Sequence, residues 1–516
     1  MVMTIGRLCS GLPGIEITGD TETGITKITA DSRLTGPDVL FVAVPGTGRD
    51  GHAYVDEVLA TGCRALVLQK DRVDQAEYIP TNFNGAVVLA DRTRPLPAVL
   101  GRRLNGDPDR KLWTAGVTGT NGKTTVSFLM REMLNRLHGP CGLLGTIAYE
   151  DGRTSETAPL TTPPGDVFYG WLGRMVANGC RSVAMELSSH GLDQERTSGL
   201  GLDVAVMTNL GRDHLDYHRD TADYLAAKSR IMEFLRPGVQ GEGMGKPGVL
   251  VLNQDDPNLA SLDTADHETV RFSTRTSSVS GSGSIDLQVR SAVLELEGTS
   301  LVLDWRGQRL TIDSPLVGRF NVENLTAALA AGVALGLDPA DCAHALGGVS
   351  QVPGRLERFV LPNGGLAVVD YAHTHDALTA VLKACDELND HRLLVVFGCG
   401  GDRDRGKRPL MGRVAAQESD LVWITSDNPR SEEPGGICRD IMAGFDEVHE
   451  PRAIGRELVI DRREAIEAAL AGAGPGDIVV VAGKGHEDYQ LIGGRVVDLD
   501  DRIIITDWIK RNRTHE

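Results

Sequence analysis

Residues 113–125 read WTAGVTGTNGKTT, in which a short apolar run leads into a loop rich in glycine. Apolar residues then recur at helical spacing, so this stretch predicts a strand, a loop and a helix in that order. The backbone N–H groups of such a loop and the positive end of the helix attract phosphate groups. Lys123 can neutralise phosphate oxygens, and the Thr124 hydroxyl can bind Mg²⁺. Because Val117 stands where the general motif has its first glycine, a chance Gly-Lys-Thr turn is the alternative interpretation.

Strands and helices also alternate toward the C-terminus. Apolar runs at Leu393–Phe397, Leu421–Thr425 and Ile478–Ala482 are separated by helical stretches, the pattern of a parallel sheet covered by helices. Residues 270–315 differ, because they are rich in Ser and Thr and their apolar residues alternate, which predicts an antiparallel insertion. The sequence therefore predicts an α/β fold.

A chain of 516 residues is too long for one compact core. Between Asp91 and Lys111 it is basic and rich in Pro and Gly, which is typical of a connection between domains. A second cluster of Gly, Ser and Pro lies between Gly347 and Gly354. We therefore predict three domains, at 1–111, 112–352 and 353–516.

The composition excludes some partners and compartments. A formal net charge of −18 argues against binding along a nucleic-acid backbone, which requires clustered Lys and Arg. The eight cysteines are scattered, with neither a CxxC pair nor zinc-ribbon spacing. We find neither a signal-peptide pattern nor an apolar run long enough to span a bilayer. These features predict a cytosolic protein with reduced thiols that binds no nucleic acid and inserts into no membrane.

Lys228 falls on the apolar face of a helix predicted after Asp220. The same face carries Tyr224, Leu225, Ile231, Met232 and Leu235. Burial disfavours the ammonium form, so an inward-facing lysine becomes a neutral amine that can act as a nucleophile. The alternative is a lysine whose stem lies along the helix while its ammonium group reaches solvent.

Further candidate residues lie where predicted strands end or helices begin. Glu186 follows the apolar stretch from Val183 to Met185, and Asp370 ends the strand from Leu366 to Val369. Sheets of α/β proteins bind ligands at such strand ends, although a solvated glutamate there is an equally ordinary feature. Asn321 and Asn324 begin an Ala-rich helical run, where asparagine often serves as a helix cap.

Together these motifs resemble those of the Mur ligases, and the TGTNGKTT loop also resembles that of folylpolyglutamate synthases. The latter should lack the first predicted domain. The resemblance to Mur ligases spans all three predicted domains. It implies an N-terminal uridine-nucleotide domain, a central phosphate-loop ATPase domain with a parallel sheet, and a C-terminal Rossmann-like domain that binds the amino acid. The segments that carry it are Asp31-Ser32-Arg33 with Phe41 to Gly46, Thr161-Thr162-Pro163, Glu186 to Gly191, Asn209 with Asp213 to His218, Asn321 to Asn324, Asp370 to Thr374, Asp427 to Arg430, and Gly483 to Glu487.

The resemblance also implies roles for individual residues. Catalysis would depend on Lys123, Glu186, His214 and Lys228. Mg²⁺ would be held by Thr124, Glu186, His214 and a CO₂-derived carbamate on Lys228. ATP would bind to Gly119, Thr120, Asn121, Gly122, Lys123, Thr124, Thr125, Asn321, Asn324, Arg355 and Asp370. The UDP-linked substrate would bind to Ala30, Ser32, Thr47, Gly48, Arg49, Thr161, Thr162, Ser188, Gln194 and Arg196. The amino acid would bind to Arg403, Asp427, Asn428, Pro429, Arg430, Gly483 and Glu487.

The implied activity is ATP-dependent addition of diaminopimelate to UDP-N-acetylmuramoyl-L-alanyl-D-glutamate by a monomer. Diaminopimelate differs from lysine by a second carboxylate, which the guanidinium of Arg430 could bind with two parallel bonds. Three alternatives stay open at this point. They are a Mur ligase that adds L-lysine, a ligase similar to folylpolyglutamate synthase, and a nucleotide-switched binding protein without ligase activity.

Overall fold

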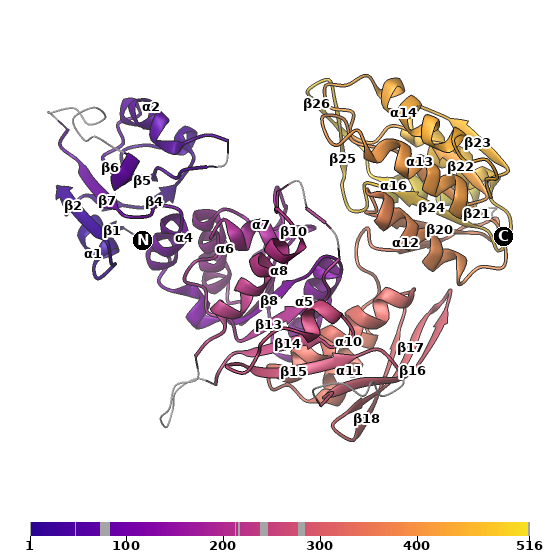
Figure 1. The fold of residues 1–516 in the computed structure, drawn as a ribbon, viewed down its shortest axis with the longest axis horizontal. Coiled ribbons are helices and arrows are strands. Elements are labelled where there is room, and N and C mark those ends of the chain that lie inside the picture. The colour runs from indigo at the N-terminus through magenta and orange to yellow at the C-terminus, as the bar shows by residue number, and fades with distance from the viewer. Residues whose placement is uncertain are drawn as a thin grey trace. The chain divides into compact units, whose positions relative to one another are not determined.

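The computed structural model of the chain describes residues 2–46, 48–72, 83–211, 213–214, 217–237, 246–276 and 284–513. The chain folds into two compact units (Figure 1). The first contains Met1–Val289, Leu303–Leu310 and Asn324–Leu346, and the second contains Arg290–Val302, Thr311–Glu323 and Gly347–Glu516. The boundaries of the three predicted domains stay a prediction.

The first unit begins with a sheet of five strands in the order β2-β7-β6-β5-β4. Strand β2 is antiparallel to β7, and the other neighbours are parallel. Helices α1 and α4 pack on one face of this sheet and α2 on the other, so its inner strands are buried and apolar, as parallel strands require. The elements are α1 (Ile5–Cys9), β2 (Ile15–Gly19), β4 (Lys27–Thr29), β5 (Val39–Val42), α2 (Val55–Ala60), β6 (Ala65–Gln69), β7 (Ala86–Ala90) and α4 (Leu96–Leu104).

The larger sheet has eleven strands in the order β11-β10-β9-β12-β8-β13-β14-β15-β16-β17-β18. Neighbours from β9 to β16 are parallel, which confirms the α/β class. The predicted strand at Trp113 is β8 (Trp113–Thr118), and the one before Glu186 is β12 (Ser182–Glu186). The others are β9 (Cys141–Leu144), β10 (Ala148–Glu150), β11 (Ser155–Thr157), β13 (Val204–Met207), β14 (Val249–Asn253), β15 (Glu268–Ser273), β16 (Leu287–Glu295), β17 (Gly298–Trp305) and β18 (Gln308–Ser314).

The prediction of an antiparallel insertion at 270–315 is wrong for its first pair of strands. β15 and β16 are parallel, with Phe272 opposite Leu287. Two residues join β16 to β17 and two join β17 to β18, and connections this short can join only antiparallel neighbours. The expectation therefore holds for β16 to β18, while β15 extends the parallel sheet.

The structure shortens one predicted helix and excludes helix capping, the alternative interpretation of Asn321 and Asn324. The helix that carries Lys228, α8, covers Thr221–Ser229 and gives way to a 3₁₀ helix over Arg230–Phe234. The chain leaves helical geometry because Leu235 pairs with Leu202 as in a parallel sheet. Asn321 and Asn324 lie inside α10 (Arg319–Ala334) rather than at its cap. The other helices of this part of the chain are α5 (Lys123–Leu137), α6 (Gly165–Ala177), α7 (Ser189–Asp193), α9 (Pro257–Ala260) and α11 (Pro339–Gly347).

The second unit contains a sheet of six strands in the order β19-β20-β24-β21-β22-β23. Only the β19–β20 pair is antiparallel. Helices α12, α13 and α14 cover one face, and α15 and α16 cover the other. The elements are β19 (Glu357–Val360), β20 (Leu366–Asp370), α12 (His375–Asp386), β21 (Leu393–Phe397), α13 (Lys407–Glu418), β22 (Leu421–Ile424), α14 (Pro434–Asp446), β23 (Gly455–Leu458), α15 (Arg462–Gly472), β24 (Ile478–Ala482), the hairpin β25 (Tyr489–Ile492) and β26 (Arg495–Asp498), and α16 (Asp501–Asn512).

Candidate functional site

The glycine-rich loop between β8 and α5 has a backbone that larger residues would not permit. Gly119 has φ of +152°, and Gly122, which precedes α5, has φ of +84°. A Cβ atom on Gly119 would lie 1.9 Å from Thr208 Oγ1. Asn209 at the end of β13 accepts two hydrogen bonds of 2.9 Å from backbone N–H groups of the loop. The loop is therefore fixed at the N-terminus of a helix of 15 residues, a geometry that binds phosphate.

Two lysines converge on this loop. Lys123 Nζ donates to the carbonyls of Gly119 and Thr120, each at 2.9 Å. Lys228 Nζ donates to the same Gly119 carbonyl at 2.7 Å. The side chains of Lys123 and Lys228 thus meet at the loop from different helices.

Lys228 is buried, as predicted from its helical face, with only 1% of the residue exposed. Its Nζ lies 4.5 Å from the ring centre of Tyr224. Burial lowers the pKa of Lys228 well below its ordinary value, and the charge of Lys123 lowers it further. Burial therefore favours the neutral amine, which is the form that reacts with an electrophile such as CO₂.

Thr124 and Glu186, both proposed metal ligands, are in contact. Thr124 Oγ1 donates to Glu186 Oε2 at 3.0 Å, and both residues are buried. Glu186 is the last residue of β12 and lies opposite Val117 of β8. Mg²⁺ prefers oxygen ligands of this kind, so the pair fits a nucleotide-bound Mg²⁺.

Thr146 is a partner of Glu186 that the sequence patterns missed. Its N–H donates to Glu186 Oε1 at 2.6 Å and its hydroxyl to Oε2 at 3.0 Å. A Cβ atom on the preceding Gly145 would lie 2.4 Å from Glu186 Oε1. The sequence signal was a Gly-Thr pair directly after the apolar run that forms β9.

His214 lies among aromatic rings. Its ring centre is 4.8 Å from that of His190 and 6.2 Å from that of Tyr224. Its side chain is 43% exposed, and its Nε2 lies 3.6 Å from Asp213 Oδ2. Within the described residues, no three His, Cys, Asp or Glu side chains form a group that could hold a metal ion. The role of His214 as a metal ligand therefore stays a prediction.

The structure brings together the residues predicted to bind the muramoyl dipeptide. The Thr162 hydroxyl lies 3.1 Å from Ser188 Oγ and donates to the Glu186 carbonyl at 2.8 Å. Arg196 Nη1 donates to the Thr162 carbonyl at 2.7 Å, and its Nη2 donates to Gln194 Oε1, also at 2.7 Å. Thr161 Oγ1 lies 3.0 Å from Thr146 Oγ1. This hydroxyl-rich group adjoins the Thr124–Glu186 pair.

Arg196 provides a test of this group. A guanidinium carries five N–H groups and can serve Thr162, Gln194 and a ligand carboxylate together, whereas a lysine cannot reproduce that geometry. We expect Arg196→Lys to raise the KM for the UDP-linked substrate by about tenfold, with the KM for ATP changed by less than about twofold. Steady-state kinetics with each substrate varied in turn would measure both. Equal changes in the two KM values would contradict the assignment.

The residues predicted to bind the uridine nucleotide lie in two loops of the N-terminal sheet. Ala30 and Ser32 follow β4, where the Arg33 guanidinium lowers the pKa of the Asp31 carboxyl to about 2. Arg49 is exposed, and its Nη1 donates to the Tyr54 hydroxyl at 3.3 Å. Gly48 is exposed beside it, and Thr47 lies outside the described residues.

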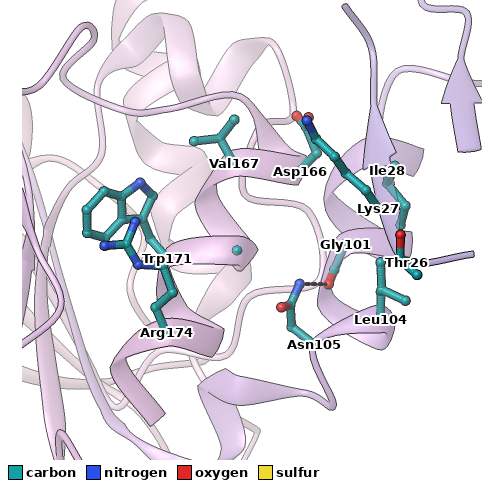
Figure 2. Close-up of a pocket in the computed structure, with 11 residues that line it drawn as sticks. Thr26, Lys27, Ile28, Gly101, Leu104, Asn105, Asp166, Val167, Trp171 and Arg174 are labelled. Atoms are coloured by element: carbon teal, nitrogen blue, oxygen red, sulfur yellow. Dashed lines mark hydrogen bonds between the residues drawn. The ribbon is translucent and has the colours of Figure 1, made fainter. Parts of the chain in front are cut away.

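A cleft of about 300 Å³ lies between β4, α4 and α6 (Figure 2). Trp171 and Arg174 form one wall, with the guanidinium 3.8 Å from the ring centre. Lys27 and Asp166 contribute opposite charges to the lining. Of the described residues that line it, none is a predicted site residue, so the chemistry expected at the phosphate loop is not located in this cleft.

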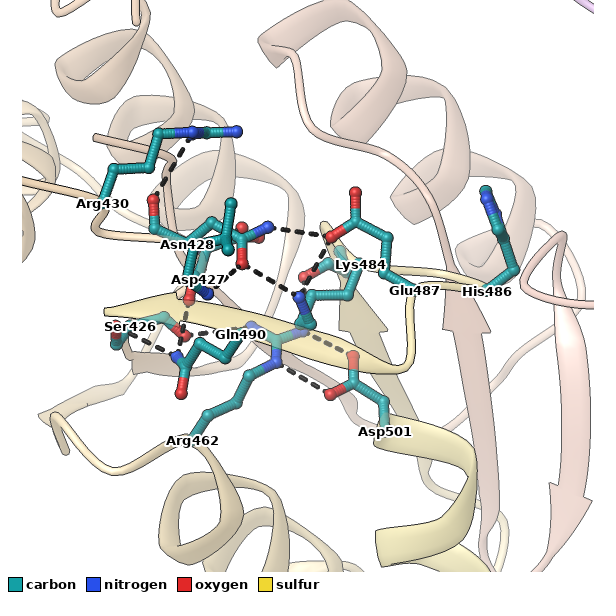
Figure 3. A network of polar contacts seen from close by, with 12 residues as sticks. Ser426, Asp427, Asn428, Arg430, Arg462, Lys484, His486, Glu487, Gln490 and Asp501 are labelled. Carbon is teal, nitrogen blue, oxygen red and sulfur yellow. Dashed lines mark hydrogen bonds and ion pairs between the residues drawn. The ribbon is translucent and has the colours of Figure 1, made fainter. Parts of the chain in front are cut away.

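In the second unit, the loop after β22 is held by a polar network (Figure 3). Asp427 and Asn428 are almost completely buried. Asn428 Nδ2 donates to Glu487 Oε2 at 2.8 Å, and its Oδ1 accepts from the backbone N–H of Leu491 at 2.9 Å. Gly483 has φ of +115°, and a Cβ atom there would lie 2.6 Å from Asp427 Oδ2. The two predicted amino-acid-binding segments are therefore in direct contact.

Arg430 ends this loop in a left-handed conformation, with φ of +52°. Its N–H donates to the Leu491 carbonyl at 2.9 Å, and its own carbonyl accepts from Gly493 N at 2.7 Å. Its Nη1 donates to the Gly401 carbonyl at 2.9 Å. Pro429 is buried beside it, whereas Arg403 is exposed on the loop that follows β21. The hairpin that contains β25 thus fixes the backbone of Arg430, and the Gly401 carbonyl holds its guanidinium.

Lys484 and Gln490 belong to the same network but were not predicted. Lys484 is 0% exposed, and its Nζ lies 3.0 Å from Glu487 Oε2. Gln490 Nε2 donates to the Asp427 carbonyl at 2.6 Å. Glu487, expected to meet a substrate ammonium, is thus already oriented by Lys484 and Asn428.

The remaining predicted ATP contacts lie in different surroundings. Asp370 is buried at the end of β20, where desolvation raises the pKa of its carboxyl although Arg355 opposes this. The Arg355 guanidinium lies 4.8 Å from the ring centre of Tyr371. Asn321 is buried, and its Nδ2 donates to the Val317 carbonyl at 2.8 Å. Asn324 Oδ1 faces the phosphate loop, 2.5 Å from where a Cβ of Gly122 would be.

Within the described ranges, no helix has both the length and the apolar character that crossing a bilayer demands.

Known proteins are similar to this chain over nearly its whole length. Residues 117–332 match the family described as "Mur ligase middle domain", and residues 354–485 match "Mur ligase, glutamate ligase domain". A UDP-N-acetylmuramoyl-L-alanyl-D-glutamate--2,6-diaminopimelate ligase of Parabacteroides distasonis is 40% identical over 507 residues, which cover 97% of this chain and 98% of the relative. The enzyme of the same name from Solibacter usitatus is 38% identical over 497 residues, covering 96% and 95%. A solved structure of an enzyme with this name is 30% identical, covers 100% of both chains and has a TM-score of 0.66.

Proposed function

Because the chain belongs to the Mur ligase family, we propose that it is the ATP-dependent ligase that joins diaminopimelate to the D-glutamate γ-carboxylate of UDP-N-acetylmuramoyl-L-alanyl-D-glutamate in peptidoglycan synthesis. The observation that carries the ligase chemistry is the buried Thr124–Glu186 contact beside a glycine-rich phosphate loop. Relatives that bear this enzyme's name and match over their full length support the choice of substrates.

The reaction needs ATP because joining a carboxylate to an amine in water is uphill. A γ-carboxylate oxygen attacks the γ-phosphorus, the bond from that phosphorus to the ADP oxygen breaks, and an acyl phosphate forms. The neutral amine then attacks the acyl carbon. The C–N bond forms, the amine loses a proton, the bond from the acyl carbon to the bridging oxygen breaks, and phosphate leaves with that oxygen.

Residues at the phosphate loop would stabilise the charge that collects on phosphate oxygens. Lys123 and the N-terminus of α5 face that charge from the protein side. Thr124 and Glu186, with His214 and a carbamate on Lys228, would hold Mg²⁺, which when bound supplies positive charge next to the β- and γ-phosphates. Asn321, Asn324, Arg355 and Asp370 would bind the rest of the nucleotide.

We further propose that residues 1–111 bind the uridine nucleotide, 112–352 bind ATP and 353–516 bind the amino acid. Thr161, Thr162, Ser188, Gln194 and Arg196 would hold the muramoyl dipeptide. Both ATP and the UDP-linked substrate are cytosolic nucleotides, so we expect the reaction in the cytosol. The monomeric state remains a prediction.

Phosphate release from ATP tests this function directly. We expect release only when the UDP-linked dipeptide and diaminopimelate are both present, and a product whose mass equals the dipeptide plus diaminopimelate minus water. A reaction with a reduced folate and L-glutamate, the substrates of the closest alternative, should give no release. Phosphate release that does not depend on the UDP-linked dipeptide or on diaminopimelate would favour a nucleotide-switched binding protein instead.

A further inference from the structure

A fully buried ion pair lies next to the loops that carry Asn428 and Glu487 (Figure 3). Arg462 Nε donates to Asp501 Oδ1 at 2.8 Å, and its Nη2 donates to Oδ2 at 2.6 Å. Both side chains are 0% exposed. Arg462 begins α15 and Asp501 begins α16, so the pair joins the two helices that cover this face of the sheet.

The same guanidinium contacts the ends of two strands. Arg462 Nη2 donates to the carbonyl of Ala482, the last residue of β24, at 3.0 Å. Its Nη1 lies 3.5 Å from the carbonyl of Ser426, just after β22. These carbonyls immediately precede Gly483 and Asp427. One side chain therefore links the starting points of both amino-acid-binding segments, which are separated in the sheet by β21.

The charge of Arg462 is also coupled to these segments. Burial has the largest single effect and lowers the pKa of Arg462, but Asp501, Asp427 and Glu487 together raise the net pKa above its ordinary value. A buried ion pair often stabilises a fold no better than apolar residues of the same volume. Stability alone therefore gives little reason for a pair at this position.

We propose that Arg462, held by Asp501, is a positioning residue for the bound amino acid. By fixing the Ser426 and Ala482 carbonyls, it sets the spacing between Asn428 and Glu487. The inference rests on the proposed function, because it concerns the site for the diamino acid. Arg462 itself need not touch the substrate.

The test replaces both charges, so that no unpaired charge stays buried, in the double variant Arg462→Met/Asp501→Asn. The control is Arg392→Met/Asp477→Asn. Arg392 and Asp477 also form an ion pair, at 2.5 Å, although the Arg392 side chain is 45% exposed. They directly precede β21 and β24 and so lie at the opposite ends of the strands from the Arg462 contacts. We expect the first variant to raise the KM for diaminopimelate about tenfold and to change the KM for ATP and for the UDP-linked substrate by less than about twofold. The control should lower the melting temperature without changing any KM.

Further results would distinguish failure of the positioning role, misfolding of the variant and failure of the proposed function. If the first variant keeps the diaminopimelate KM within about twofold of wild type, or the control raises it equally, the positioning role is overturned. If the double variant does not fold, Arg462→Lys alone decides, because a lysine can still pair with Asp501 but cannot bond to it and to both strand carbonyls at once. A diaminopimelate KM raised more than about twofold would support the role, and a KM within about twofold of wild type would refute it. If wild type itself shows no release dependent on diaminopimelate, the proposed function fails, and this inference fails with it.

Discussion

Replacing Lys228 by alanine is expected to lower kcat by about 10²- to 10³-fold, the loss that follows removal of one group stabilising charge in a transition state. The amine is buried against the Gly119 carbonyl, and this burial favours its neutral form. A neutral amine adds to CO₂ and releases a proton, which gives a carbamate in place of a cation. Lys228→Ala would leave a space where that carboxylate stood.

Short carboxylates provide the decisive measurement for Lys228. Acetate or formate should restore part of the activity of Lys228→Ala in phosphate-release assays by occupying the place of the carbamate. Lys484→Ala is the matched control, because Lys484 is also fully buried but is paired with Glu487, and carboxylates should not rescue it. Near-normal activity of Lys228→Ala without additives would refute the carbamate.

Features with a local signature could be predicted from the sequence. Strands β21 and β24 were predicted with their observed bounds, because each is an apolar run bounded by polar residues and turns. The inward direction of Lys228 followed from the helical spacing of its apolar neighbours. The phosphate loop followed from its glycines between a strand and a helix.

Features that depend on distant pairing could not be predicted. No local sequence pattern indicates that β15 lies parallel to β16, or that pairing of Leu235 with Leu202 ends the helical stretch after Lys228. Helix capping, the alternative for the asparagines of α10, stayed open in the sequence because a cap is recognised only by where the helix begins. In each case tertiary contacts override the local pattern.

The same limit applied to the candidate site. Residues that contact a ligand stand in recognisable motifs, whereas residues that support them do not. Thr146 supports Glu186 from 40 residues away, and Asp501 supports Arg462 from 39 residues away. These partners become visible only when the sheet brings strand ends together.

The choice between diaminopimelate and L-lysine should depend on Arg430. The backbone N–H of Arg430 donates to the Leu491 carbonyl, its own carbonyl accepts from Gly493 N, and its Nη1 donates to the Gly401 carbonyl. The guanidinium therefore has a fixed direction and can bind a distal carboxylate with two parallel bonds. Lysine lacks that carboxylate and would leave the guanidinium desolvated without its partner. Such an unsatisfied polar group costs about 1 to 3 kcal/mol, which corresponds to a preference of roughly 5- to 150-fold in kcat/KM.

Direct competition of diaminopimelate against L-lysine, with products separated by mass, measures this preference. In wild type diaminopimelate should dominate, and in Arg430→Ala the ratio of the two kcat/KM values should fall toward one, because the variant loses the partner of the distal carboxylate.

Arg405→Ala is the control for this competition. Arg405 lies on the loop after β21 and pairs with Glu432 at 3.1 Å while 73% exposed, so its loss should leave the preference unchanged. Efficient incorporation of lysine by wild type would overturn the assigned amino acid but not the proposed ligase chemistry, because the proposed roles of the phosphate loop, Glu186 and Lys228 concern the carboxylate that is activated and not the amine that is added.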